Sequence, residues 1–191
     1  MDMARDQDLE LSDEALLVLY CNGDQQAASR LTGRLVPRVF GFCLRILGDR
    51  AEAEDVTQDA MLRLWRMAPD WQQRDAKLST WLFRVASNLC TDRLRKRGDV
   101  GLDQIDEPTD TGPGAEALLM QADRKSALDR ALAALPERQR QAVILRHIEG
   151  LSNPEIAEIL GIGIEAVESL TARGKRGLAA ALSNKKEELG L

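Results

Sequence analysis

Apolar residues recur every three or four positions along most of this chain, a spacing that places them on one face of an α-helix. Ser12, Asp24 and Asp49 supply the side-chain oxygens that cap helix N-termini, and Pro37 is expected to kink one helix. In the N-terminal half, the pattern and these signals predict four helices, at about 12–22, 24–47, 49–67 and 79–97.

The last third of the chain has the pattern of a helix-turn-helix. One helix is expected from about 135, a second after Ser152, and a third at about 164–182. Ser152 and Glu155 have the spacing of a capping box, and Gly161 falls where a left-handed residue closes a helix. Because a helix-turn-helix places its last helix in the major groove, this unit is expected to bind DNA.

We therefore predict an all-α protein made of two small helical domains. The expected units are an N-terminal domain at 1–97, an acidic linker at 98–120 and a C-terminal helix-turn-helix domain at 121–191. The linker combines glycine and proline with acidic residues, so it has little to bury and is expected to be extended and flexible. A length of 191 residues allows each domain a core of its own.

The net charge of −5 at first argues against binding to DNA, but the charge is unevenly distributed. Seven acidic residues and no basic one lie between Gly98 and Asp123, whereas the segment up to Arg97 is neutral. The segment from Arg124 onward is slightly basic. The negative charge therefore belongs to the linker region, and basic faces remain possible on both domains.

Residues that enzymes and metal sites commonly use are scarce. The single histidine, His147, has no partner spaced to make it a ligand or a base, and we expect a surface or domain-packing role. Glu52, Glu54, Asp55 and Asp59 suggest a carboxylate metal site, but such sites in helical bundles also use Glu-x-x-His pairs. We expect no catalytic residue, no metal and no cofactor.

Other features indicate the cell compartment. Three cysteines without a C-x-x-C spacing are typical of a reducing cytoplasm rather than of a disulfide framework. No apolar run approaches the roughly 20 residues that span a bilayer. The polar, acidic N-terminus does not look like a signal peptide. We expect a cytoplasmic protein without membrane insertion.

Three motifs resemble those of bacterial RNA polymerase sigma factors. The run EDVTQDAMLRLW at 54–65 is similar to the helix that binds core polymerase in that family. The run STWLFRVASNLCTDRLR at 79–95 is similar to the promoter −10 helix, and 135–176 resembles the domain that reads the −35 element. With only these two domains, the chain resembles the extracytoplasmic-function (ECF) group. The resemblance implies a non-enzymatic factor that docks on polymerase, selects a promoter and helps to melt it.

The resemblance assigns candidate residues to each surface. Polymerase docking is expected on a polar stripe of Asp55, Gln58, Asp59 and Arg63. Contacts to the −10 element need cations for phosphates and flat side chains for bases, which is the chemistry of Trp71, Arg84, Asn88, Arg93, Arg95, Lys96 and Arg97. A core position is the alternative for Trp71 and the expected one for Trp81. Contacts to the −35 element are assigned to Glu168, Ser169, Thr171, Arg173, Lys175 and Arg176.

The −35 helix departs from the commoner family pattern. Many members carry a basic residue directly after the position of Val167 and another two positions on, where this chain has Glu168 and Leu170. Glu168 can accept a hydrogen bond from cytosine N4, and Arg173 can pair with guanine or hold phosphate. The resemblance therefore leaves the −35 sequence open.

Other readings fit parts of the same pattern. A stand-alone dimeric helix-turn-helix regulator would bind promoter DNA tightly without polymerase, whereas a sigma factor binds it strongly only with the core enzyme. A protein-interaction module that mimics a sigma factor is a third reading, and the basic −10 helix argues against it. The G-x-G-x-x-A at 161–166 lacks the preceding strand that a dinucleotide fingerprint requires.

The resemblance also implies partners. ECF sigma factors are usually held inactive by an anti-sigma factor that covers the polymerase-binding surfaces. The run VESLTARGKR at 167–176 is similar to a branch often paired with soluble zinc-binding anti-sigma factors. The expected partners are core RNA polymerase, promoter DNA and an anti-sigma factor, in a bacterial stress response.

Overall fold

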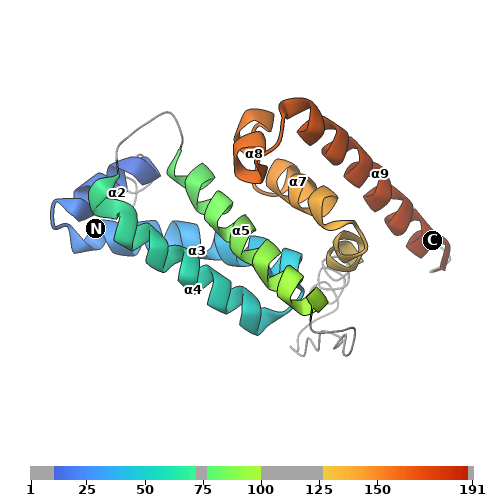
Figure 1. The fold of residues 1–191 in the computed structure, drawn as a ribbon, viewed down its shortest axis with the longest axis horizontal. Coiled ribbons are helices and arrows are strands. Elements are labelled where there is room, and N and C mark those ends of the chain that lie inside the picture. Colours follow the sequence, from blue (N-terminus) through green and yellow to red (C-terminus); the bar gives the residue numbers. More distant parts are fainter. Residues whose placement is uncertain (1–10, 72–76, 100–126, 189–191) are drawn as a thin grey trace, which may run out of the picture.

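The computed structural model describes residues 11–71, 77–99 and 127–188. Within these ranges the chain is helical without a strand, as the all-α prediction requires. Most of the predicted linker lies outside them. The helices are α2 (Asp13–Cys21), α3 (Gln25–Leu47), α4 (Arg50–Met67), the short 3₁₀ helix η2 (Ala68–Asp70), α5 (Leu78–Asp99), α7 (Glu137–His147), α8 (Asn153–Leu160) and α9 (Ile164–Glu188). In Figure 1, α2 to α5 form one bundle, and α7 to α9 lie against its α5 side.

Three of the N-terminal helices, α2, α3 and α4, begin directly after the residues that their capping signals predicted. The Ser12 hydroxyl accepts from the backbone amide of Ala15 at 3.1 Å, and the Asp49 carboxylate accepts from that of Glu52 at 2.8 Å. Asp24 caps α3 in the same way, and this helix continues through Pro37 to Leu47. These caps satisfy backbone donors that the first helical turn leaves without partners, so they fix where each helix starts.

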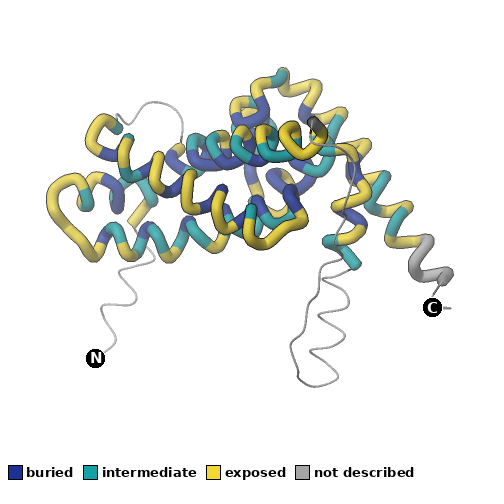
Figure 2. The backbone as a smooth tube through the Cα atoms, turned by 60° about the horizontal axis from the view of Figure 1, so that its bottom comes forward, coloured by how far each residue is buried: buried dark blue, intermediate teal, exposed yellow. Residues whose placement is uncertain are grey.

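The N-terminal bundle packs one stripe from each helix into a shared core. Buried and exposed positions alternate along the tube with helical periodicity in Figure 2. On α4, the spacing of Val56, Ala60, Leu64 and Met67 predicts one inner side; the first three are buried, whereas Met67 is only half-buried. The stripe from α3 is the longest because this helix contacts α2, α4 and α5; it includes Leu31, Leu35, Val39, Phe42 and Ile46.

The helix-turn-helix forms as predicted. The Glu155 carboxylate accepts hydrogen bonds from both the amide and the hydroxyl of Ser152, and Gly161 closes α8 with φ of 63°. A close approach of α9 to α7 depends on Gly174, where an added Cβ would lie 2.5 Å from Cγ2 of Val143. This approach holds the last helix firmly against the rest of the unit.

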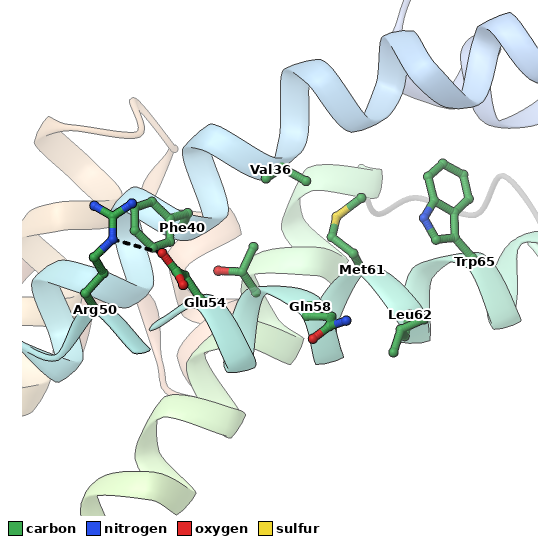
Figure 3. Close-up of a pocket in the computed structure, with 9 residues that line it drawn as sticks. Val36, Phe40, Arg50, Glu54, Gln58, Met61, Leu62 and Trp65 are labelled. Carbon is green, nitrogen blue, oxygen red and sulfur yellow. Dashed lines mark ion pairs between the residues drawn. The ribbon is translucent and has the colours of Figure 1, made fainter. Parts of the chain in front are cut away.

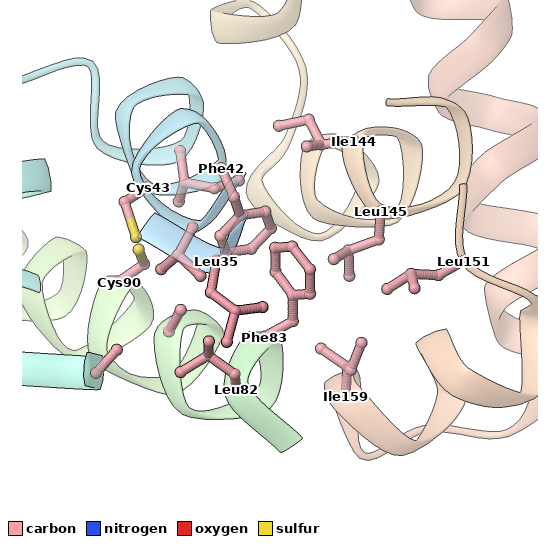
Figure 4. Packing of buried hydrophobic residues seen from close by; sticks show 14 of the residues in the cluster. Leu35, Phe42, Cys43, Leu82, Phe83, Cys90, Ile144, Leu145, Leu151 and Ile159 are labelled. Carbon is pink, nitrogen blue, oxygen red and sulfur yellow. The ribbon is translucent and has the colours of Figure 1, made fainter. Parts of the chain in front are cut away.

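The two helical units share one hydrophobic cluster. Phe83 of α5 is 1% exposed, and Figure 4 shows its ring between the N-terminal bundle and Leu145, Leu151 and Ile159 of the other unit. The helical spacing of Trp81, Val85 and Leu89 predicts a buried side of α5 that includes Trp81 and omits Phe83, but the structure leaves Trp81 only half-buried. The reason is that α5 packs on two partners, so a second face of the helix is covered by the helix-turn-helix.

Polar contacts surround this shared cluster. Arg140 donates to the backbone carbonyl of Ile46 at 3.0 Å, across the two units. Thr91 donates to the Glu137 carboxylate at 2.8 Å, and Gln141 donates to Thr91 at 3.2 Å. The predicted domains therefore lie in direct contact.

Candidate functional site

A groove of about 450 Å³ runs between α3 and α4 (Figure 3). Its apolar lining includes Phe40, Met61 and Trp65, and an Arg50–Glu54 ion pair of 2.9 Å borders one end. Leu62 also lines the groove and is 44% exposed, although it belongs to a large apolar type. A single exposed leucine is common on protein surfaces, so it is the apolar groove beside Leu62 that makes this face a candidate contact surface.

The predicted polymerase-binding stripe divides between this groove and its flank. All four of its residues are exposed, but only Gln58 lines the groove. Asp55, Asp59 and Arg63 recur every fourth residue on the neighbouring stripe of α4. Asp55 also lies 3.8 Å from Arg93 of α5, so one of these carboxylates already faces a cation.

Sequence reasoning missed the groove itself. Its α4 side includes Glu54, Gln58 and Leu62, which recur every fourth residue, and its α3 side includes Phe40. An apolar Leu62 within an otherwise polar stripe was the available signal. The contribution of α3 had no such signal, because it depends on how the two helices cross.

The basic face of α5 is partly free and partly engaged. Arg84 and Asn88 are exposed on one face, and Arg95 shares this face and lies 3.4 Å from the Asp92 carboxylate. Lys96 is exposed near the helix end. These four residues are exposed, and their contact with the −10 element stays a prediction.

Arg97 and Trp71 have protein partners instead. Arg97 pairs with Glu52 at 2.8 Å and donates to the Leu47 carbonyl at 2.9 Å, and thereby ties α5 to α4. Trp71 packs against the hydrophobic cluster, and its indole nitrogen is buried without an acceptor among the described residues. This placement favours the core alternative for Trp71.

On α9, most of the predicted −35 residues are exposed, whereas Val167 and Gly174 of the same helix are buried. These exposed residues are Glu168, Ser169, Arg173, Lys175 and Arg176. Thr171 differs, because its hydroxyl oxygen is buried. Arg173 donates to the Ser169 carbonyl at 3.3 Å, and Glu168 accepts from Asn153 at 3.4 Å. The exposed side of α9 thus carries both acceptors and cations.

A helix-turn-helix packed on a helical bundle is an arrangement typical of DNA-binding proteins. Residues 31–100 match the family described as Sigma-70 region 2, and residues 125–178 match that described as Sigma-70, region 4. The chain is 30% identical to the ECF RNA polymerase sigma factor SigW of Bacillus subtilis (strain 168), over 82% of this chain and 89% of that protein. It is 32% identical to the ECF RNA polymerase sigma factor SigE of Mycolicibacterium smegmatis, over 94% of this chain and 73% of that protein.

The same fold occurs in two proteins that were solved in complex with a partner. The chain superposes on CnrH in complex with the cytosolic domain of CnrY with a TM-score of 0.67 and 24% identity, over 90% of this chain and 97% of CnrH. For the sigma factor RpoE in complex with the anti-sigma factor NepR from Bartonella quintana, the TM-score is 0.66 at 24% identity, over 81% of this chain and 96% of RpoE.

The chain belongs to the ECF family of RNA polymerase sigma factors, and it is an alternative sigma factor. The resemblance of its sequence motifs to those of ECF sigma factors is thereby confirmed. Sigma factors are transcription initiation factors that act on RNA polymerase in the cell interior. Each helix in 11–71, 77–99 and 127–188 is too short or too polar to cross a lipid bilayer.

Proposed function

We propose that this sigma factor works through three surfaces: the groove and flank of α4 for core RNA polymerase, the exposed face of α5 for the −10 element, and that of α9 for the −35 element. In this proposal, 1–97 binds polymerase and the −10 element, 98–120 is a tether and 121–191 reads the −35 element. A cytoplasmic location follows from the location of RNA polymerase. The chain has no catalytic role of its own.

The groove between α3 and α4 carries the polymerase part of this proposal. It combines an apolar floor with an exposed Leu62 and lies beside the exposed Asp55 and Asp59. An apolar centre with a polar rim is the usual anatomy of a protein interface. A partner helix with an apolar stripe and basic flanking residues fits this combination.

An anti-sigma factor is the second partner that we propose for this surface. The Bartonella quintana RpoE was solved in complex with the anti-sigma factor NepR, and CnrH was solved in complex with the cytosolic domain of CnrY. A partner that occupies the α3–α4 groove would exclude polymerase from it. Inhibition would then be competitive with the core enzyme.

In vitro transcription with core RNA polymerase tests the proposal. Transcripts from a promoter library should require both the core enzyme and this chain. Tight promoter binding by the chain alone, without transcripts, would instead identify a stand-alone regulator. For the docking surface, Leu62→Glu and the double charge reversal Asp55→Lys/Asp59→Lys should weaken core binding in a titration.

A matched control separates docking from a general effect of charge. Asp70 is exposed on η2, outside the groove and its flank, so Asp70→Lys should leave core affinity unchanged. Circular dichroism must show native helicity for each variant, because Asp55 also faces Arg93. Unchanged core affinity in both groove and flank variants would refute this assignment.

A further inference from the structure

Acidic residues lie in the first turns of α9 and basic residues lie further along it, and this order limits how the helix can bind DNA. Its first two turns carry Glu165 and Glu168 and no cation, whereas Arg173, Lys175 and Arg176 follow further along. In a helix-turn-helix, the N-terminal residues of the recognition helix contact base edges. A carboxylate beside DNA phosphates is repelled, so an acidic residue in these turns is favourable only opposite a hydrogen-bond donor on a base.

The exposed Glu168 side chain has a hydrogen-bond partner on the neighbouring helix α8. Asn153, the first residue of α8, donates from Nδ2 to Oε1 of Glu168 at 3.4 Å. The preceding residue, Val167, is fully buried and fixes the rotation of α9 at this point. The hydrogen bond occupies one carboxylate oxygen, and the other remains available to a ligand while the whole side chain is exposed.

The chemistry of a carboxylate selects among the four bases. An ionised carboxylate only accepts hydrogen bonds. In the major groove, guanine offers the acceptors N7 and O6, thymine offers O4, and adenine places its N6 donor beside the N7 acceptor. Cytosine presents its N4 amino donor without an adjacent acceptor on the same base, so it is the base that suits Glu168 best.

We propose that Glu168, positioned by Asn153, reads a cytosine in the −35 element. This inference rests on the proposed role of α9 in promoter recognition. It makes Glu168 a specificity determinant that works by attraction to cytosine and by repulsion of guanine and thymine. Asn153 is a positioning residue in this arrangement, because it holds the carboxylate without itself needing to touch the base.

A selection from a promoter library randomised through the −35 element tests the inference, with holoenzyme made from core polymerase and the full chain. The wild type should enrich cytosine at one position by at least about fivefold over each other base. Glu168→Ala should reduce that preference to under about twofold at this position alone. Glu168→Gln should move it towards adenine, because an amide matches adenine N6 and N7 as donor and acceptor.

Two further variants distinguish recognition of a base by Glu168 from a purely structural role of this residue. Asn153→Ala should weaken the cytosine preference to a value between those of wild type and Glu168→Ala. Glu158→Gln changes another exposed glutamate of the helix-turn-helix, on α8, and should leave the selected consensus unchanged.

The outcomes separate this inference from the proposed function. If the wild-type holoenzyme makes no transcript from any library member, the proposed function fails. If it does, and Glu168→Ala and Glu168→Gln recover the wild-type −35 consensus, then Glu168 does not read a base and only this inference is overturned. A lowered melting temperature with an unchanged consensus would likewise assign Glu168 and Asn153 to stability alone.

Discussion

The Arg38 guanidinium lies 3.1 Å from the Glu149 carboxylate, and this ion pair joins α3 to the turn that follows α7. The Glu149 side chain is only 6% exposed, against 39% for Arg38. The same guanidinium lies 5.4 Å from the centre of the Phe83 ring on α5. One side chain thus contacts both helical units at the edge of their shared hydrophobic cluster.

Removal of this carboxylate should destabilise the protein. We expect Glu149→Ala to lower the free energy of unfolding by about 1–3 kcal/mol, because it leaves a partly buried guanidinium without its partner. The Arg50–Glu54 pair offers a control, with side chains 76% and 56% exposed. Glu54→Ala should cost less than about 1 kcal/mol, since exposed ion pairs contribute little. Urea denaturation measures both, and equal losses would contradict the expected role of burial.

Two helical glycines should respond to alanine in opposite directions. At Gly174, an added Cβ would lie 2.5 Å from Val143 and 3.2 Å from the Gln139 carbonyl, so Gly174→Ala should destabilise by about 1–3 kcal/mol. At Gly33 in α3, nothing lies within 4 Å of an added Cβ. Gly33→Ala should stabilise by about 0.5–1 kcal/mol, because alanine loses less backbone entropy in a helix. Thermal melting measures both shifts: an unchanged or raised melting temperature for Gly174→Ala would refute the close α7–α9 contact, and a lowered one for Gly33→Ala would contradict the entropy argument.

The N-terminus of α8 should make stability depend on acidic pH. Burial alone would raise the pKa of Glu155, but hydrogen bonds from Ser152 and Lys77 outweigh it and lower this pKa below its ordinary value of 4.5. The ionised Glu155 carboxylate therefore adds to the free energy of unfolding above pH 4.5. This contribution is lost as the pH falls through the lowered pKa of Glu155. At pH 7, Glu155→Gln should be less stable than wild type by about 0.5–2 kcal/mol. Denaturation at several pH values should show this difference shrinking below pH 4.5, and a constant difference would exclude the linkage.

The three cysteines should differ sharply in reactivity. Cys21 is exposed, whereas Cys43 and Cys90 are buried with their sulfur atoms facing each other between α3 and α5 (Figure 4). The hydrogen bond with Cys43, followed by burial, raises the pKa of Cys90 well above its usual range. Because the thiolate is the nucleophile, we expect Cys21 to react with a disulfide reagent at least about 100-fold faster than the other two in the native protein.

Unfolding provides the control for this thiol assay. All three cysteines should react at similar rates in denaturant, and Cys21→Ser should remove the fast phase from the native protein. Three fast-reacting thiols in the native wild type would mean that the α3–α5 core opens readily.

Promoter melting should depend on the exposed face of α5. Replacing Arg84, Asn88 and Arg95 with alanine should reduce open-complex formation more than closed-complex binding, because these residues are assigned to the unstacked −10 strand. Permanganate footprinting of thymines measures the melted region, and a filter-binding assay of the same holoenzyme measures total promoter binding. Normal thymine reactivity in the triple variant would contradict the assignment.

Sequence predicted most reliably what local chemistry decides. The starts of α2, α3, α4 and α8 follow from side chains that cap their own helix, and such contacts span only a few residues. Phe83 was missed because its burial depends on a unit that lies more than 50 residues further along the chain. The groove between α3 and α4, and the inward turn of the Thr171 hydroxyl, likewise depend on how helices pack and leave no periodic signal.

The packing of Phe83 has a thermodynamic consequence for promoter search. Any rearrangement that separates the helix-turn-helix from α5 transfers Phe83 and its apolar neighbours into water, at roughly 1.5–3 kcal/mol for each large side chain. A ligand shifts such an equilibrium only as far as it prefers the separated form. If promoter binding requires that separation, a partner that favours the separated form would raise the apparent affinity for DNA without touching DNA. The free energy of the hydrophobic contact between α5 and the helix-turn-helix would then be a cost that partner binding offsets, and this cost would couple partner binding to promoter binding.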